Sequence, residues 1–214
     1  MAAFDPRNAE KLVGASYVLL RIQPSESPMK HLALAAALGL LASPAFAEAV
    51  SVGHFDGIGL EGGGHVVLKH GSTQSVTILK GSTRYTTFRI RHDNVLEIKA
   101  CNTNCPPVYD LEIEIVTPDL HSASIEGGGH ITAADGFPEQ DDFTAAVDGG
   151  GHIEMQALPA RSVEAAIDGG GHIDVTAKHT LHAAVDGGGS ITYHGDPQVS
   201  SAIDGGGSVN KAAK

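Results

Sequence analysis

The sequence predicts an all-β protein built as a single-stranded parallel β-helix or solenoid, in which short coils of strand stack around a shared interior. The first observation is a block of one acid, three glycines and a His or Ser, whose acids are Glu61, Glu126, Asp148, Asp168, Asp186 and Asp204. The second is the spacing of the last five acids, which lie 22, 20, 18 and 18 residues apart. A repeat of about 18–22 residues cannot bury its own apolar face, so successive copies must stack on one another.

The third observation is a strict alternation of apolar and polar residues around each block. Five residues after the acid come Ile131, Ile153 and Ile173, and the residue before the acid is always Ile or Val in these copies. The acid and the His have the opposite parity, so the pattern has the period of two that marks a strand with one buried face. The β-branched residues also favour strands. A β-propeller is excluded because its blades need about 40–50 residues, and a β-sandwich is the structural alternative.

The first 47 residues are predicted to be absent from the folded domain. Residues 29–47 resemble a secretory signal peptide, with a basic start at Met29, a short apolar stretch and cleavage after Ala47. Residues 1–28 are interpreted as an upstream extension from a start codon assigned too early, with a long signal n-region from Met1 as the alternative. The protein is therefore expected in the periplasm, in the medium or at the cell surface. No second apolar segment follows, so the mature chain is not expected to insert into a membrane.

The remaining chain is interpreted as one domain with an irregular and a regular part. Residues 48–120 contain uneven strand-like runs, which we expect to form atypical first coils that cap the stack. Residues 121–214 hold the regular repeats. Corners or loops are predicted at Gly136-Phe137-Pro138, Leu158-Pro159-Ala160 and Gly195-Asp196-Pro197, because Gly and Pro interrupt strands.

Charge and cysteine content narrow the partners. From residue 48 onward 10 Lys/Arg face 22 Asp/Glu, a net charge of 10 − 22 = −12. Such an acidic chain argues against nucleic acid and favours cations. In an exported protein, Cys101 and Cys105 are expected to close a small disulfide loop; a metal half-site and a free thiol pair are the alternatives.

Stacking in register would align the blocks into two outward ladders, one of carboxylates and one of imidazoles. Carboxylates about 5 Å apart repel one another, which favours a bound cation. Adjacent imidazoles with a neighbouring carboxylate suit Zn²⁺ or Cu²⁺. The candidate metal ligands are therefore His130, His152, His172, Glu126, Asp148 and Asp168. The competing interpretation is that the glycines permit a tight corner and the ladders are ordinary polar surface. Histidines elsewhere, such as His194, are expected to be ordinary surface residues.

Several motifs together resemble the putative auto-transporter adhesin, head GIN domain family of exported bacterial proteins. They are Phe55-Asp56-Gly57-Ile58 before the first block, Val116-Thr117-Pro118-Asp119-Leu120 before the repeats, and Ile191-Thr192-Tyr193-His194-Gly195-Asp196-Pro197 before the last block. The resemblance implies a β-helix-like fold, an extracytoplasmic location and no established catalytic activity. The family's usual block resembles Ser-Gly-Ser-Gly-Asp, whereas here the outer positions are Asp or Glu and His, and the central one is Gly.

The predicted function is a non-catalytic, adhesin-like module that binds an unknown surface ligand or protein. Open strand edges at the ends of a solenoid also favour a homo-oligomer. The first alternative is a periplasmic protein that binds Zn or Cu through the ladders. The second is a polysaccharide-active enzyme. It is disfavoured because an anionic sugar needs a basic groove, and from residue 100 onward the only cationic residues are Arg161, Lys178, Lys211 and Lys214.

Overall fold

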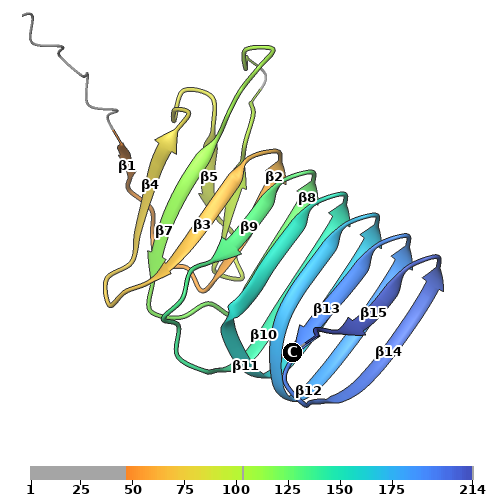
Figure 1. The fold of residues 1–214 in the computed structure, drawn as a ribbon. Coiled ribbons are helices and arrows are strands. Elements are labelled where there is room, and N and C mark those ends of the chain that lie inside the picture. The colour runs from red at the N-terminus through yellow and green to blue at the C-terminus, as the bar shows by residue number, and fades with distance from the viewer. Residues whose placement is uncertain (1–46, 103, 214) are drawn as a thin grey trace, which may run out of the picture. The chain divides into compact units, whose positions relative to one another are not determined.

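The computed structural model describes residues 47–102 and 104–213, and these residues form strands and loops without a helix. The all-β prediction is confirmed. The predicted extension at 1–28 and almost all of the predicted signal peptide at 29–47 lie outside the described residues. Since the described part contains no helix, it also contains none that could cross a membrane. All its strands join one curled, open sheet, whose longest continuous path has 11 strands (Figure 1).

The N-terminal half of the sheet is mixed, which explains its uneven sequence pattern. Its strands are β1 (Glu48–Val50), β2 (Gly57–Gly62), β3 (His65–His70), β4 (Ser75–Lys80), β5 (Thr87–Ile90), β6 (Val95–Lys99) and β7 (Glu112–Thr117). β1 with β4, β4 with β7 and β5 with β6 are antiparallel pairs. β2 with β6 and β3 with β7 are parallel pairs. The sheet therefore contains antiparallel ladders that a purely parallel arrangement lacks.

The C-terminal half contains only parallel ladders, and its strands lie side by side as successive loops of the chain (Figure 1). They are β8 (Ser122–Gly127), β9 (His130–Ala133), β10 (Gln140–Gly149), β11 (His152–Gly169), β12 (His172–Gly187), β13 (Ser190–His194), β14 (Gln198–Gly205) and β15 (Ser208–Lys211). β11 and β12 each run from one glycine block to the next.

The predicted breaks at Gly136-Phe137-Pro138 and Gly195-Asp196-Pro197 are loops, as expected. The corner or loop predicted at Leu158-Pro159-Ala160 is not a loop, because β11 continues through it. The ladder with β12 only shifts register on either side of Ala160. Proline lacks an N–H to donate, so a strand tolerates it where the ladder is already irregular.

The apolar columns predicted from the alternation form the core. Ile153 pairs with Ile131 on one side and with Ile173 on the other, and all three are fully buried. A second column contains Ile125, Val147, Ile167 and Val185. Burying such a side chain contributes about 1.5–3 kcal/mol, so the interior columns favour one register over all others.

Two of the three glycines in each block are required by the turn. Gly169 has φ +120°, and a Cβ there would lie 2.6 Å from the carbonyl oxygen of Gly149 in the previous block. A Cβ on Gly171 would lie 2.5 Å from a methyl group of Val147. By contrast, a Cβ on the middle residue, Gly170, would meet nothing within 4 Å. The first and third glycines therefore permit close stacking, while the middle one has open space.

The last strands leave part of the interior uncovered. Among the described strands, β14 pairs only with β12, and β15 pairs only with β13. Val199 and Ile203 continue the buried columns of Leu181 and Val185, yet they are 41% and 47% exposed. The described chain thus presents an unpaired edge with apolar residues at this end, the kind of edge to which another strand can add.

We expect Gly169→Ala to destabilise the fold by at least about 2 kcal/mol, because it adds both left-handed backbone strain and a clash with a carbonyl oxygen. Gly170→Ala is the matched control and should change the free energy of unfolding by less than about 0.5 kcal/mol. Urea denaturation of both variants measures the difference. Equal effects at the two positions would contradict the assignment of roles within the block.

Candidate binding face

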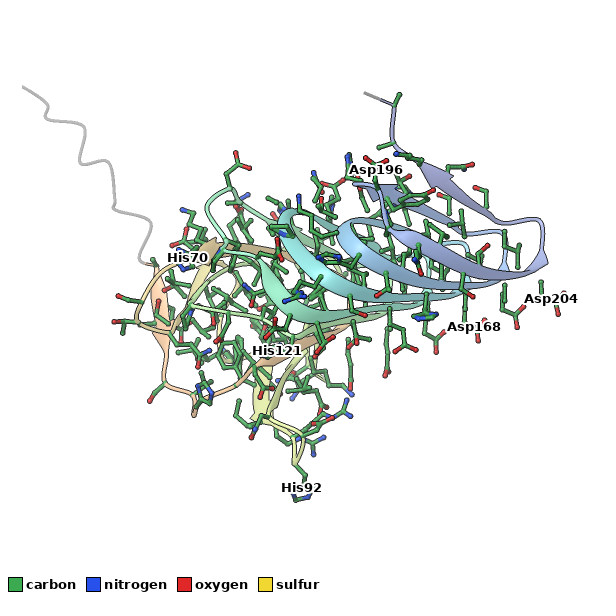
Figure 2. The ribbon with its side chains drawn as sticks, turned by 90° about the horizontal axis from the view of Figure 1, so that it is seen from below. His70, His92, His121, Asp168, Asp196 and Asp204 are labelled. Atoms are coloured by element: carbon green, nitrogen blue, oxygen red, sulfur yellow. A yellow bond between two sulfur atoms is a disulfide. The ribbon has the colours of Figure 1, made fainter. Side chains whose placement is uncertain are left out.

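The acids of the six blocks form one continuous outward column, here called the acid column. Each acid pairs in register with the next, in the order Glu61, Glu126, Asp148, Asp168, Asp186 and Asp204. Register neighbours in a sheet lie about 4.8 Å apart. Figure 2 shows Asp168 and Asp204 on the same side of the ribbon, with their side chains directed away from it. The sheet thus displays a row of regularly spaced carboxylates.

A second outward column follows on the other side of the glycine corners, and we call it the histidine column. It consists of His65, His130, His152 and His172, followed by Ser190 and Ser208. The centroids of neighbouring imidazole rings are 5.0, 5.7 and 6.2 Å apart along the column. The rings are tilted by 41–46° to one another, so they are close neighbours without stacking face to face.

Two residues beyond the histidine column lies a third outward row, here called the flanking column. It consists of Thr132, Glu154, Asp174 and Thr192. Its side chains reach diagonally to histidines of neighbouring strands. Nε2 of His130 is 3.5 Å from Oε2 of Glu154, and Nε2 of His194 is 2.9 Å from Oδ1 of Asp174. Nε2 of His65 is 3.3 Å from Oγ1 of Thr132.

The structure separates the two halves of the predicted ligand set. His130, His152 and His172 are brought together as expected. Glu126, Asp148 and Asp168 are likewise brought together, but in the acid column. Among the described residues, no hydrogen bond or ion pair joins an acid of this column to a histidine. Nor do three or more His, Cys, Asp or Glu side chains there already converge on one point where a metal ion could sit.

The sequence-based ligand set omitted one member of the histidine column and two carboxylates beside it. His65 belongs to it although 65 residues of chain separate it from His130, because β3 pairs with β9. Glu154 and Asp174 lie two residues after a histidine, which places them on the same outward face. That shared parity is the signal by which both carboxylates could have been found. His194, expected to be ordinary surface, contacts Asp174 instead.

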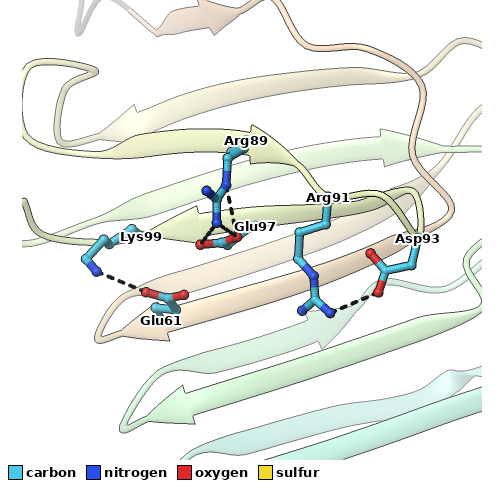
Figure 3. Close-up of polar contacts among 6 residues, drawn as sticks. All are labelled: Glu61, Arg89, Arg91, Asp93, Glu97 and Lys99. Atoms are coloured by element: carbon cyan, nitrogen blue, oxygen red, sulfur yellow. Dashed lines mark hydrogen bonds and ion pairs between the residues drawn. The ribbon is translucent and has the colours of Figure 1, made fainter.

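Cations close both columns at the end nearest the mixed half of the sheet. Lys99 pairs in register with Glu61 and lies 3.2 Å from its carboxylate (Figure 3). Lys80 lies 2.8 Å from Glu112, the register neighbour of His65. The hydrogen bond and charge of Lys80 hold the pKa of Glu112 below its usual range. Both outward rows therefore begin beside an ion pair. The acid column continues as carboxylates to β14, whereas the histidine column ends in the neutral Ser190 and Ser208.

A bidentate ion pair strengthens the hairpin beside Lys99. The guanidinium of Arg89 on β5 donates hydrogen bonds of 2.7 and 3.1 Å to the carboxylate of Glu97 on β6 (Figure 3). This contact is the main reason why the pKa of Glu97 is lowered. Arg91 and Asp93 pair nearby at 2.9 Å. Most positive charges of this half are thus engaged with carboxylates, and Arg84 lies over the ring of Tyr85.

The cysteines lie in the loop that follows β6. Cys101 and Cys105 are at disulfide distance, with Cα atoms 5.8 Å apart. A cross-link of this kind closes a short loop after β6, ahead of β7 and the regular repeats.

Asp168→Asn should stabilise the fold by about 0.5 kcal/mol at low salt, because it removes a charge flanked by Asp148 and Asp186 in the same column. The gain should largely vanish at about 1 M NaCl, where charges are screened within about 3 Å. Urea midpoints at the two salt concentrations measure it. A gain that persists in high salt would show that repulsion is not its cause.

Arg89→Met should weaken stability in a pH-dependent way. Because the folded-state pKa of Glu97 is depressed by Arg89, the contribution of this pair is present above the unfolded pKa of about 4.3 and is lost as pH falls through the folded-state pKa. The difference in unfolding free energy from wild type should therefore be largest near neutral pH and shrink in acid. Arg161→Met, at an exposed position on β11 away from Glu97, serves as the control. An Arg89→Met difference that stays constant with pH would contradict the mechanism.

Comparison with known proteins gives one family match. The family model described as "Putative auto-transporter adhesin, head GIN domain" matches residues 54–141 and 139–197. Among curated proteins no match is found.

Solved structures similar to the chain include several named as putative adhesins. A putative adhesin from Bacteroides fragilis NCTC 9343 is 20% identical, with a TM-score of 0.49, and the match covers 78% of this chain and 96% of that one. A putative adhesin from Parabacteroides distasonis ATCC 8503 is 18% identical with a TM-score of 0.38, at the same coverage of both chains. A structure from the same organism titled putative lipid binding protein is 18% identical with a TM-score of 0.37, again at this coverage. Because the family model covers more than half of the sequence, the chain belongs to the putative auto-transporter adhesin, head GIN domain family.

Proposed function

We propose that this protein is an exported, non-catalytic binding module of the adhesin type, which contacts its partner through the outward columns of the repeats. The observation that carries this proposal is the acid column, in which six carboxylates follow one another in register across six strands. A periodic row of like groups suits a partner that is itself extended or repetitive, because many weak contacts then add up through effective concentration. The family description, which names an adhesin, supports the same function.

We further propose that residues 121–214 form a parallel β-solenoid with one repeat per coil. Support comes from β11 and β12, which each extend from one glycine block to the next and pair in register over most of their length. Such a solenoid holds outward side chains at fixed intervals on rigid strands, and rigid elements lose little entropy when they bind.

The surface beside the acid column favours a flat, cationic partner. A shallow hollow of ≈ 280 Å³ has small residues such as Ser124, Ala146 and Ala166 in its lining, with Asp148 and Asp168 along one side. Small side chains allow a partner to approach the carboxylates closely. The net charge of −12 from residue 48 onward would attract positively charged groups and repel nucleic acid.

The module would act outside the cytoplasm, after removal of residues 29–47 as a signal peptide. The basic start at Met29, the apolar stretch and the small residues that end at Ala47 support export. The unpaired edge of β14, with Val199 and Ile203 exposed, is compatible with self-association at the same location.

We expect purified residues 48–214 to bind at least one member of an immobilised panel of cationic partners, such as chitosan and basic extracellular-matrix proteins, saturably in surface plasmon resonance. Asp148→Asn/Asp168→Asn should weaken that binding at least about tenfold, since it removes two adjacent charges of the acid column. Asp135→Asn/Glu139→Gln removes the same net charge from the exposed loop before β10 and should leave binding unchanged.

Two outcomes would contradict the proposal. The first is the absence of binding across the whole panel. The second is equal weakening by both double variants, which would show that binding depends on net charge and not on the position of the carboxylates. Release of soluble sugar from any bound polysaccharide would favour the enzyme instead.

A further inference from the structure

We propose that His130, His152 and Glu154 form a binding site for a divalent transition metal ion such as Zn²⁺. The site lies in the histidine and flanking columns, across the glycine corner from the acid column. The site is independent of the partner that the acid column would bind. Its carboxylate ligand is Glu154, on the histidine side of the corner, in place of the acids predicted from the sequence.

The spacing of the ligand atoms fits a metal ion. His130 and His152 are register partners on β9 and β11, with ring centroids 5.7 Å apart. Nε2 of His130 is 3.5 Å from Oε2 of Glu154. Two ligand atoms about 2.0–2.2 Å from a tetrahedral Zn²⁺ are about 3.4 Å apart. The nitrogen of His130 and the oxygen of Glu154 therefore already lie at the separation of two ligands of one ion.

The loose contact between His130 and Glu154 points to the same place. Nε2 of His130 is shielded from solvent and makes no hydrogen bond among the described residues, and its ion-pair contact there is with Glu154. Its distance of 3.5 Å from Glu154 is too long for a strong hydrogen bond. Leaving a polar atom buried and unsatisfied costs free energy. A metal ion between this nitrogen and the carboxylate would satisfy both groups.

Neighbouring positions on the same face are less suited. The next histidine toward the C-terminus, His172, has its Nδ1 2.8 Å from the hydroxyl of Ser190. Asp174, which corresponds to Glu154 in the next repeat, lies 2.9 Å from His194. In the preceding repeat the corresponding residue is Thr132, a neutral hydroxyl. Within the described part of the column, the position between β9 and β11 therefore has two neighbouring histidines and a carboxylate, Glu154, that is not already paired with a histidine outside the column.

The third ligand has to turn toward the ion. The three side chains do not yet converge, but His152 is exposed, and its ring touches only the rings of its column neighbours in the described chain. A change of side-chain rotamer can bring one of its nitrogens to the position between His130 and Glu154. Water would complete the tetrahedral set that zinc prefers.

The test is isothermal titration of metal-free residues 48–214 with ZnCl2 in the absence of other ligands. We expect one Zn²⁺ per chain. His130→Ser and His152→Ser should each weaken binding at least about tenfold, and Glu154→Gln several-fold, because each removes a ligand. Serine is chosen because Ser190 and Ser208 occupy the same column, so the fold accommodates it.

Matched controls separate this site from general acidity and from stray histidines. Glu126→Gln removes a charge from the acid column, and His182→Ser removes an exposed histidine from a different outward position. Both should leave zinc affinity within about twofold of wild type. As an independent readout, the electron paramagnetic resonance spectrum of bound Cu²⁺ should show coupling to two imidazole nitrogens in wild type and to one in His152→Ser.

Three results would overturn the proposal. They are the absence of zinc binding by the wild-type chain, unchanged affinity in the His130→Ser/His152→Ser double variant, and loss of binding in Glu126→Gln but not in Glu154→Gln. The panel of cationic partners, run in the presence of a chelator, reports on adhesion separately, so failure of either proposal leaves the other measurable.

Discussion

A pair of backbone hydrogen bonds at each glycine corner fixes how successive repeats stack. The N–H of Gly170 donates to the carbonyl oxygen of Gly149, and the N–H of His172 donates to that of Gly151, each over 2.9 Å. The same pair recurs at the other corners as far as Ser190, and the last corner has the bond from the N–H of Ser208 to the carbonyl oxygen of Gly189. Because a slip of one residue would turn every side chain to the opposite face, these bonds and the Ile and Val columns together determine which groups line up outside.

That register is maintained against an electrostatic cost. Carboxylates in the acid column have like charges as neighbours, and such pairs are unfavourable in a sheet. The buried columns and the corner hydrogen bonds offset this repulsion, and Lys99 relieves it at one end. The histidine column lies beyond the corner, so its chemistry is spatially distinct. The two faces can therefore serve different ligands on one scaffold, a cationic surface on one side and a metal ion on the other.

The sequence was sufficient for the parts of the fold that repeat. Alternation placed Ile131, Ile153 and Ile173 in one interior, and the glycine blocks aligned the acids. It was insufficient where pairing is not local. His65 joins the histidine column only through the parallel pairing of β3 with β9, which the intervening antiparallel strands conceal. The contact between His130 and Glu154 is diagonal and depends on side-chain rotamers, which a linear pattern does not specify. The loop expected at Pro159 is absent because the ladder between β11 and β12 shifts register there and accommodates the proline. Such a shift depends on how two strands pair, so the linear sequence does not reveal it.

The open space at the middle glycine has an evolutionary consequence. The first and third glycines cannot vary without rebuilding the corner, and they are also the two that this block shares with the family's usual Ser-Gly-Ser-Gly-Asp. The central position is free in Gly63, Gly128, Gly150, Gly170, Gly188 and Gly206, since nothing lies within 4 Å of a Cβ added at any of them. Mutation could therefore add a side chain at one middle glycine after another. Selection could change what the molecule recognises in this way while its architecture stays constant.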